Sequence, residues 1–413
     1  MRFDFEHSDF EKYKLGELVE NVVAGATPKT SVEEYWDGGN IPWLSSGEVH
    51  KKYVYFTDKF ITSEGYNNSS TKLVPKNSVL IALAGQGKTR GTVAINKIEL
   101  CTNQSIASII PNDNLYYKFL FYYLESKYDY LRALSSSDGG RGGLNLKLIR
   151  SIPIQIPSVD EQKVISNFIN SIDKKITILE RKYESYQDFK KYLMQQIFAQ
   201  KLRFADSDSC WKEISLKDIG TFYRGHSYNS TNVADEGLLV LRSNNIQGNV
   251  LDFSEDGLQF VDKDCKKELE LQKNDIVICM SNGTRRLVGK SAEYTGNYEN
   301  KVTVGAFCSI FRTENKLAKY LFQTESYKKN LYLILAGTNI NNLKNSDLEK
   351  FKFNIPTNES EINKIHDLFV SIDNKIDYNK KQLEEITLFK KGLLQQMFVV
   401  QLILSLLQNK KHI

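Results

Sequence analysis

The sequence lacks most features that mark secreted or membrane proteins. Its five cysteines are scattered without a CxxC pair, which predicts reduced and buried thiols in a cytoplasmic protein. The N-terminal segment is charged throughout and does not have the pattern of a signal peptide. The longest apolar run, "MFVVQLILSLLQ" (397–408), is too short to cross a bilayer, so we expect no membrane association.

Signatures of catalysis and metal binding are also missing. The five histidines do not cluster with cysteines or acids at metal-ligand spacing, and the GxSxG and HExxH patterns are absent. No two prolines are consecutive, which excludes the Asx-Pro-Pro-aromatic motif of base methyltransferases. We therefore expect no catalytic residue, no metal site and no cofactor on this chain.

One stretch imitates a phosphate-binding loop. "ALAGQGKT" (82–89) follows a strand-like run, but Ala82 replaces the first glycine of the motif. The residues after it are β-branched and predict a strand, whereas a phosphate-binding loop must open a helix. We expect a basic turn between two strands. The alternative, a nucleotide hydrolase, would require ATP binding that depends on Lys88 and Thr89.

The composition is that of a folded protein with several domains. The chain has 413 residues, of which 41% are hydrophobic and 25% are charged, so two or more domains with sizeable cores are expected. The formal net charge of +5 permits a polyanionic partner without requiring one, because the placement of charge matters more than its sum.

The chain is an internal duplication. "FKKYLMQQIF" (189–198) returns as "FKKGLLQQMF" (389–398), and "ISNFINSIDKKI" (165–176) returns as "IHDLFVSIDNKI" (365–376). A lobe with mixed strand and helix patterns precedes each of these helical segments. The two helical segments are closely repeated in sequence, whereas the lobes share a common pattern of strands and helices and differ in their loops. This suggests one scaffold that recognises two different targets.

This organisation predicts four segments. The first lobe covers 1–158, the first helix 159–202, the second lobe 203–357 and the second helix 358–413. Each lobe is predicted to be α/β or α+β, because short β-branched runs alternate with amphipathic helices.

The two helical segments carry heptad patterns. The seventh-position series is Ile165, Ile172, Leu179, Tyr186 and Leu193 in the first copy, and Ile365, Ile372, Asn379, Ile386 and Leu393 in the second. Phe168 and Phe189, like Leu368 and Phe389, are assigned to the complementary seam position, and the stripe is widened by Ile169, Ile176, Tyr183 and Ile197. The pattern predicts two helices of about 60 Å that form an antiparallel intramolecular coiled coil, with one lobe at each end. The alternative is two ordinary core helices in independent domains.

The loops of both lobes are rich in residue types that commonly contact DNA. Arg can donate two hydrogen bonds to guanine, Asn can pair with adenine, and Lys can hold phosphates. Any single loop could be an ordinary solvated turn, but the loops recur at matching places in both lobes. The candidate DNA-binding residues are Lys88, Arg90, Arg141, Arg242, Asn244, Asn245, Arg285, Arg286 and Asn339.

The whole chain resembles the specificity (S) subunit of type I restriction–modification systems. The resemblance rests on the junction of first lobe and helix (145–176), with Ile156 and Pro157 followed by Glu161 and Gln162, and on the helix ends. The second junction departs from this pattern, because Ser360, Glu361 and Ile362 replace the Glu-Gln pair.

The resemblance implies a subunit that is not an enzyme. Each lobe would be a target recognition domain that reads one half of a split double-stranded DNA target. Two modification (M) subunits would dock and supply S-adenosylmethionine, and restriction (R) subunits would use ATP and Mg²⁺. The helix residues assigned to partner binding are Phe189, Leu193, Phe389 and Leu393. The alternative is a cytoplasmic coiled-coil scaffold that never touches DNA.

Overall fold

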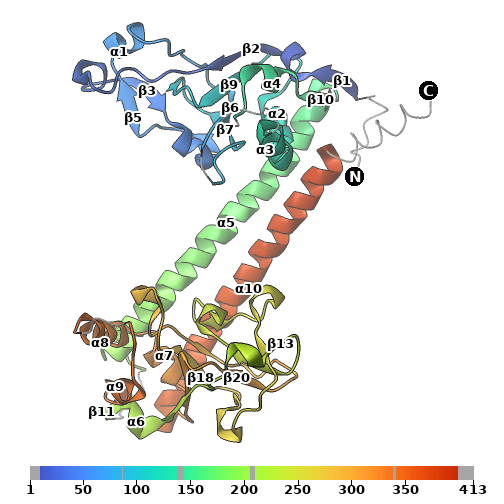
Figure 1. The fold of residues 1–413 in the computed structure, drawn as a ribbon. Helices are drawn as coiled ribbons and strands as arrows, with labels where there is room; N and C mark the ends of the chain where they lie inside the picture. The colour runs from blue at the N-terminus through green and yellow to red at the C-terminus, as the bar shows by residue number, and fades with distance from the viewer. Residues whose placement is uncertain (1–9, 86, 137–142, 205–209, 338–340, 399–413) are drawn as a thin grey trace, which may run out of the picture. The chain divides into compact units, whose positions relative to one another are not determined.

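The computed structural model describes residues 10–85, 87–136, 143–204, 210–337 and 341–398. The chain divides into two compact units, 1–181 with 380–413 and 182–379. Each unit combines one lobe with half of each long helix, so the two long helices, α5 (Val159–Phe198) and α10 (Glu359–Phe398), contribute to both units (Figure 1).

The first lobe is built on a mixed, mainly antiparallel sheet in the order β2-β9-β6-β7-β4. Its strands are Val19–Ala24, Ile106–Pro111, Val79–Ala82, Val93–Asn96 and Tyr53–Val54. A three-stranded sheet, β5-β3-β8, comprises Lys59–Ile61, Ile41–Leu44 and Cys101–Thr102. The pair β1-β10 (Glu11–Lys14 and Pro153–Ile156) joins the two ends of the lobe.

Helices cover this sheet because its central strands are apolar on both faces. All four residues of β6 and of β7 are buried, so neither face of these strands can meet water. The residues that cover them from α2, Phe119 among them, belong to the same hydrophobic core. The helices of this lobe are α1 (Ser63–Asn67), α2 (Tyr117–Ser126), α3 (Tyr128–Ser136) and α4 (Leu146–Arg150).

The second lobe repeats the central strand order of the first, with one strand fewer in its first sheet and one more in its second. The sheet β12-β21-β18-β19 comprises Thr221–Arg224, Cys308–Arg312, Ile276–Cys279 and Ser291–Glu293. The sheet β13-β17-β14-β20 comprises Val233–Ala234, Phe260–Val261, Leu238–Leu241 and Val302–Val304. The remaining strand pairs are β11-β22 (Trp211–Ser215, Lys352–Pro356) and β15-β16 (Ile246–Gln247, Val250–Leu251). The helices are α6 (Leu216–Ile219), α7 (Ala318–Leu321), α8 (Glu325–Ala336) and α9 (Asn345–Leu348).

Glycines at one matching site show that the duplication extends to the backbone. A Cβ atom on Gly25 would lie 1.8 Å from the carbonyl oxygen of Thr102, and one on Gly225 would lie 2.1 Å from that of Gly305. Only glycine allows so close an approach of two backbone segments. The two close contacts fall one residue apart in the repeat, but the Gly25 amide donates to Ile106 O and the Gly225 amide to Cys308 O at equivalent positions, which confirms the predicted repeat of one α+β scaffold.

The long helices run antiparallel. In the first unit, Ile165 and Ile169 of α5 share a hydrophobic core with Leu393 and Phe398 of α10. In the second unit, the other end of α5, with Leu193, Met194 and Ile197, packs in one core with Ile365, Phe369 and Ile372. The start of each helix therefore meets the end of the other, as the heptad pattern predicted.

The seam follows the prediction in part. Phe168 and Leu368 pack against the hydrophobic cores, as predicted. Phe189 and Phe389 were assigned to the same seam position, but they are 49% and 52% exposed. Further buried residues lie four positions after members of the seventh-position series, as Ile169 lies four positions after Ile165. At 3.6 residues per turn, steps of four and then three keep a stripe on one helix face. This stripe places Lys190 and Lys390, rather than the neighbouring phenylalanines, against the opposite helix.

The first helix ends earlier than the predicted residue 202. Gln200 has a φ of +57°, and the amides of Lys201 and Leu202 both donate to Gln196 O, which is a left-handed helix cap. The second helix begins one residue later than predicted, at Glu359. Residues 399–413, which the sequence assigned to this helix, lie outside the described residues.

The cysteines follow the prediction only in part. All five are free thiols, and Cys101, Cys279 and Cys308 are buried, but Cys210 is exposed. Cys279 and Cys308 face each other across β18 and β21, and burial raises the pKa of the Cys308 thiol to about 12. That thiol is thus kept in the protonated, unreactive form. Separately, none of the described helices is long and apolar enough to span a membrane.

Candidate nucleic-acid interface

The phosphate-loop lookalike is a hairpin turn. It connects β6 to β7, which pair antiparallel through Ile81 and Val93. No helix begins after the turn, so the aligned amides that cradle a phosphate at a helix N-terminus are missing from this site. The prediction of a basic turn between two strands is confirmed.

This turn is held rigidly while its basic side chain reaches solvent. The hydroxyl of Tyr128 donates to Lys88 O at 2.9 Å, and Arg132 Nη1 donates to Gly87 O at 2.6 Å. The Lys88 side chain is exposed, and Arg90 is half-buried. A fixed backbone with a free ammonium group suits a phosphate contact.

A second segment of the first lobe lies beside this turn. The amide of Leu144 donates to Leu83 O at 3.2 Å, so residues 143–145 lie at the base of the hairpin. Arg141, the third candidate of this lobe, lies outside the described residues.

In the second lobe three candidate loops converge. Asn282 Nδ2 donates to Ser243 Oγ at 3.1 Å, which joins the β18–β19 loop to the short helix η5 (Ser243–Asn245). Asn341 Nδ2 donates to Gly283 O at 3.2 Å and adds the loop after α8. Loops that are about 40 to 60 residues apart in sequence thus form one polar surface.

The candidates on this surface differ in their exposure. Arg285 and Arg286, in the short helix η8 (Arg285–Leu287), and Asn244 are exposed to solvent. Arg242 is half-buried and reaches Gly257 O at 3.5 Å. Asn339 lies outside the described residues.

Asn245 shapes the surface from below. It is only 2% exposed, its Oδ1 accepts from the Arg242 amide at 2.9 Å, and its Nδ2 donates to Asp252 O and Gly257 O. The side chain is therefore occupied by the loop itself. Its predicted direct contact with a base would require these three hydrogen bonds to break.

Sequence reasoning missed His226, which lies next to this surface. Its amide donates to Val304 O at 2.7 Å, and its imidazole is buried. Burial and the charge of Lys263 lower the pKa of the imidazole, so it is neutral near pH 7. Among the described residues its Nε2 has no hydrogen-bond partner. A glycine follows a strand at the matching positions 25 and 225, and His226 comes directly after the second of them. This repeated glycine was the sequence signal that could have identified the position.

The junction motif that carries the family resemblance has a structural explanation. The side chain of Gln162 donates to Asn114 O and Pro157 O at 2.9 Å each, and accepts from the Tyr116 amide at 2.8 Å. This glutamine fastens the start of α5 to the first lobe. In the second copy Ile362 replaces it with an apolar contact, and the preceding Glu361 pairs with Arg203 at 3.1 Å.

Each lobe is also latched to both long helices through a lysine and an aspartate. In the first unit Lys390 lies 2.7 Å from Asp173 and 2.7 Å from Glu125, and the Tyr122 hydroxyl donates to Asp173 at 3.0 Å. Burial and the neighbouring carboxylate raise the pKa of Tyr122, so the phenol stays protonated as a donor. This set, which we call the first latch, joins α2, α5 and α10.

The second latch is the repeat-equivalent of the first. Lys190 lies 2.7 Å from Asp373 and donates to Gln323 at 2.9 Å, and the Tyr320 hydroxyl donates to Asp373 at 3.1 Å. Burial raises the pKa of Tyr320 as well. The two latches fix each lobe on its own part of the helix pair in the same manner.

The four predicted partner-binding residues divide into two kinds. Phe189 and Phe389 are half-exposed at equivalent positions, and both can meet another protein. Leu193 and Leu393 are 7% and 6% exposed and belong to the cores between helices and lobes. Their side chains are occupied by these cores, and their assignment to partner binding stays a prediction.

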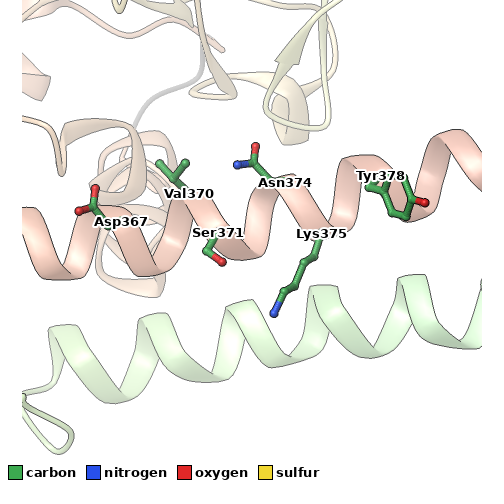
Figure 2. A pocket seen from close by; sticks show the side chains of 6 residues that line it. All are labelled: Asp367, Val370, Ser371, Asn374, Lys375 and Tyr378. Carbon is green, nitrogen blue, oxygen red and sulfur yellow. The ribbon is translucent and has the colours of Figure 1, made fainter.

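A shallow groove also lies along α10. Figure 2 shows its six lining side chains, all from this helix: Asp367, Val370, Ser371, Asn374, Lys375 and Tyr378. Most of them are exposed and polar, which fits a solvated or docking face better than a small-molecule site. Within the described part of the chain, no group of three or more His, Cys, Asp or Glu could hold a metal ion.

Comparisons with known proteins agree with this architecture. The family model described as "Type I restriction modification DNA specificity domain" matches twice, over residues 7–185 and 208–388. The MjaVIII specificity subunit of Methanocaldococcus jannaschii is 23% identical over 94% of this chain and 91% of its own length. The EcoR124I/EcoR124II specificity subunit of Escherichia coli is 28% identical over 45% of this chain, and the matched part spans about half of that relative.

Solved structures show the same fold. The S subunit of a type I restriction–modification system from M. genitalium superimposes with a TM-score of 0.60 at 17% identity, covering 96% of this chain and 98% of that one. A structure described as showing complex assembly and conformational transition of the type I R-M system gives a TM-score of 0.56 at 14% identity, covering 96% and 99%. With two matching domains and the shared fold, the chain belongs to the type I restriction–modification DNA specificity family.

Proposed function

We propose that this chain is the sequence-recognition subunit of a type I restriction–modification complex, in which each lobe reads one half of a bipartite double-stranded DNA target. One observation carries the proposal: two lobes share a scaffold down to matching glycines, yet present different side chains on their loops. A duplicated scaffold with diverged loops suits two independent half-sites. The basic and amide side chains on those loops supply the chemistry for phosphates and base edges.

In this proposal the chain supplies recognition and assembly only. S-adenosylmethionine belongs to two modification subunits, and ATP and Mg²⁺ belong to restriction subunits, all in the cytoplasm. Half-exposed Phe189 and Phe389 are the apolar anchors for the modification subunits, because large exposed aromatics at symmetric sites suit two identical partners. Leu193 and Leu393 hold the helix surface that presents them.

The antiparallel helices set the distance between the two half-sites in this proposal. A helix of 40 residues is about 60 Å long, which is enough to carry two reading surfaces about one or more helical turns of DNA apart. Each latch ties a lobe to its own part of the helix pair.

The experiment that tests the function is methylation of random duplexes. The chain is co-purified with its modification subunits, incubated with S-adenosylmethionine and a random library, and the methylated positions are sequenced. We expect one bipartite sequence with a gap of constant length, and none with the modification subunits alone. A coiled-coil scaffold that does not bind DNA would add no sequence preference, and that result would refute the proposal.

A further inference from the structure

One exposed aromatic ring lies among the polar loops of the second lobe. Phe307, in the turn between β20 and β21, is 70% exposed, and its ring makes no aromatic contact within the described part of the chain. Leaving a phenylalanine in water forgoes the stabilisation that its burial would provide. A single exposed ring is not unusual in itself, but this one differs in its fixed backbone and in the side chains around it.

The backbone that carries this ring is fixed. Phe307 O accepts hydrogen bonds from the amides of Met280 and Ser281, at 2.8 and 3.2 Å. On its N-terminal side the Gly305 amide donates to Leu241 O at 2.8 Å, and Gly305 O accepts from Cys308 at 2.8 Å. The turn is therefore tied to both β14 and β18, and the ring projects from a rigid base.

The scaffold does not require a phenylalanine here. In the first lobe Leu83 donates to Ser105 O at 2.8 Å, which is the bond that Met280 makes to Phe307. The Asn103 amide likewise donates to Leu44 O at 3.0 Å, as Gly305 does to Leu241. Ser105 is thus the structural equivalent of Phe307. The same turn carries a hydroxyl in one lobe and a large apolar ring in the other, which is expected of a residue that reads a target.

The surroundings of the ring favour a polyanion. Four segments are joined to the turn or to one another. Segment 225–232 is joined by the His226–Gly305 bridge, and 242–248 follows Leu241, whose carbonyl accepts from Gly305. Segment 281–290 is joined by the Ser281 amide, and 341–345 is joined to 281–290 by the bond from Asn341 to Gly283 O. None of the four contains an Asp or a Glu, and together they contain Arg242, Arg285, Arg286, Lys290 and Lys344, whereas 252–257, which is hydrogen-bonded to Arg242 and Asn245, adds Asp252, Glu255 and Asp256. The cations thus lie on the segments joined to the turn, where they can pair with the phosphates of DNA.

We infer that Phe307 is an apolar wedge that contacts the bases of the half-site read by the second lobe. Proteins insert phenylalanine between base steps, which unstacks them and makes binding depend on how easily that step deforms. The ring would read deformability or a thymine methyl, while Arg and Asn on the adjoining loops read base edges and phosphates. This inference rests on the proposed function and gives the two lobes different modes of reading.

The test replaces Phe307 with the residue that the first lobe uses. In the complex with modification subunits, Phe307→Ser should bind its target duplex about 5- to 100-fold more weakly, as expected for the loss of one base–aromatic contact. Duplexes with 2-aminopurine at successive positions of that half-site report unstacking by fluorescence. We expect a rise at one step with the natural protein and with Phe307→Trp, and none with Phe307→Ser.

Matched controls separate the possible causes. Phe56→Ser removes a 64% exposed ring from the first lobe, away from these loops, and should leave affinity and fluorescence unchanged. Phe307→Ser should keep the thermal stability of the complex, because the ring is exposed. Phe307→Ala, which also removes the ring, is the second variant should the serine unfold the lobe. Unchanged affinity and fluorescence in whichever of these two variants is folded would overturn the wedge. So would a loss of methylation at unchanged DNA affinity, which would indicate a protein contact. Failure of the natural complex to select any bipartite sequence would instead refute the proposed function.

Discussion

The ammonium of Lys390 on α10 lies 2.7 Å from the carboxylate of Asp173 on α5. The repeat-equivalent pair joins Lys190 on α5 to Asp373 on α10 at the same distance. Each helix thus carries an aspartate in its first half and a lysine in its second half. Both charges find a partner only when the helices run antiparallel in one alignment, so these charge pairs specify the register of a mainly apolar seam, in which Asn379 is also buried.

The two latches should differ in strength. The Lys390 and Asp173 side chains are 8% and 11% exposed, whereas those of Lys190 and Asp373 are 15% and 29% exposed. Breaking a buried pair costs about 3–5 kcal/mol, and solvent reduces that cost. In the first latch Lys52, 3.4 Å from Glu125 and 3.7 Å from Asp173, still offsets part of the carboxylate charge when Lys390 is removed. We expect Lys390→Met to lower the free energy of unfolding by about 3 kcal/mol and Lys190→Met by less, measured by urea denaturation.

A double variant provides the control for the latch. Asp173→Asn with Lys390→Met removes both charges, so it should recover part of the stability lost by Lys390→Met alone. If the double variant lost, relative to the natural protein, the sum of the stabilities lost by Lys390→Met alone and by Asp173→Asn alone, the two residues would not be coupled.

The lobes should be exchangeable as independent readers. Because β1 pairs with β10 from Glu11 to Ile156, an exchange that begins at Leu15 would split this strand pair, so the exchanged segment should run from 11 to 157. Replacement by the lobe of another family member should change one half of the methylated sequence and leave the other half and the gap intact. Methylation-site sequencing measures this, and a simultaneous change of both halves would contradict independent reading.

Exposed basic residues on the loops should contribute through phosphates. Each lost phosphate contact lowers the slope of log affinity against log salt by about 0.9. We expect this reduction for Lys88→Ala, Arg285→Ala and Arg286→Ala in binding titrations at several salt concentrations. Lys375→Ala, an exposed cation on α10 outside the loops, is the control and should leave the slope unchanged. Equal slopes in all four variants would place the DNA surface elsewhere.

The gap between half-sites should depend on the connection after α5. A four-residue insertion between Gln200 and Phe204 is expected to change the gap and to keep both half-sites. Arg203 is paired with Glu361 there, so the insertion should precede Arg203 to keep that ion pair. Methylation mapping gives the gap length. An active complex with the original gap would show that the partner subunits or the DNA set the distance.

The second lobe should lose stability in mild acid through His226. Its folded-state pKa lies below the unfolded value of about 6.5, so the unfolded chain binds more protons as the pH falls through that range. Stability contributed by the neutral imidazole is therefore present above about pH 6.5 and is lost below it. We expect the melting temperature to fall less between about pH 7.5 and 5.5 in His226→Gln than in the natural protein. His50→Gln, at an exposed histidine, should behave like the natural protein.

The duplication, the α+β class of the lobes and the antiparallel pairing of the helices could all be predicted without a structure. These features follow from local sequence patterns. A heptad repeats along each long helix, and the β-branched residues around Gly91 predict the hairpin after β6. The family resemblance likewise rests on a short junction, whose Gln162 proves to fasten α5 to the first lobe.

Only the tertiary structure decided which residues meet. The convergence of Ser243, Asn282 and Asn341, the burial of Asn245 and the fixed exposure of Phe307 all depend on strand pairs between distant segments. The incorrect assignment of Phe189 to the seam has the same origin. A heptad pattern identifies a stripe of residues on a helix, but the lobe that packs beside the helix decides which edge of that stripe is buried. Local periodicity is a property of consecutive residues, whereas contacts across a sheet are chosen by the fold as a whole, and this protein's candidate reading surface is made of such contacts.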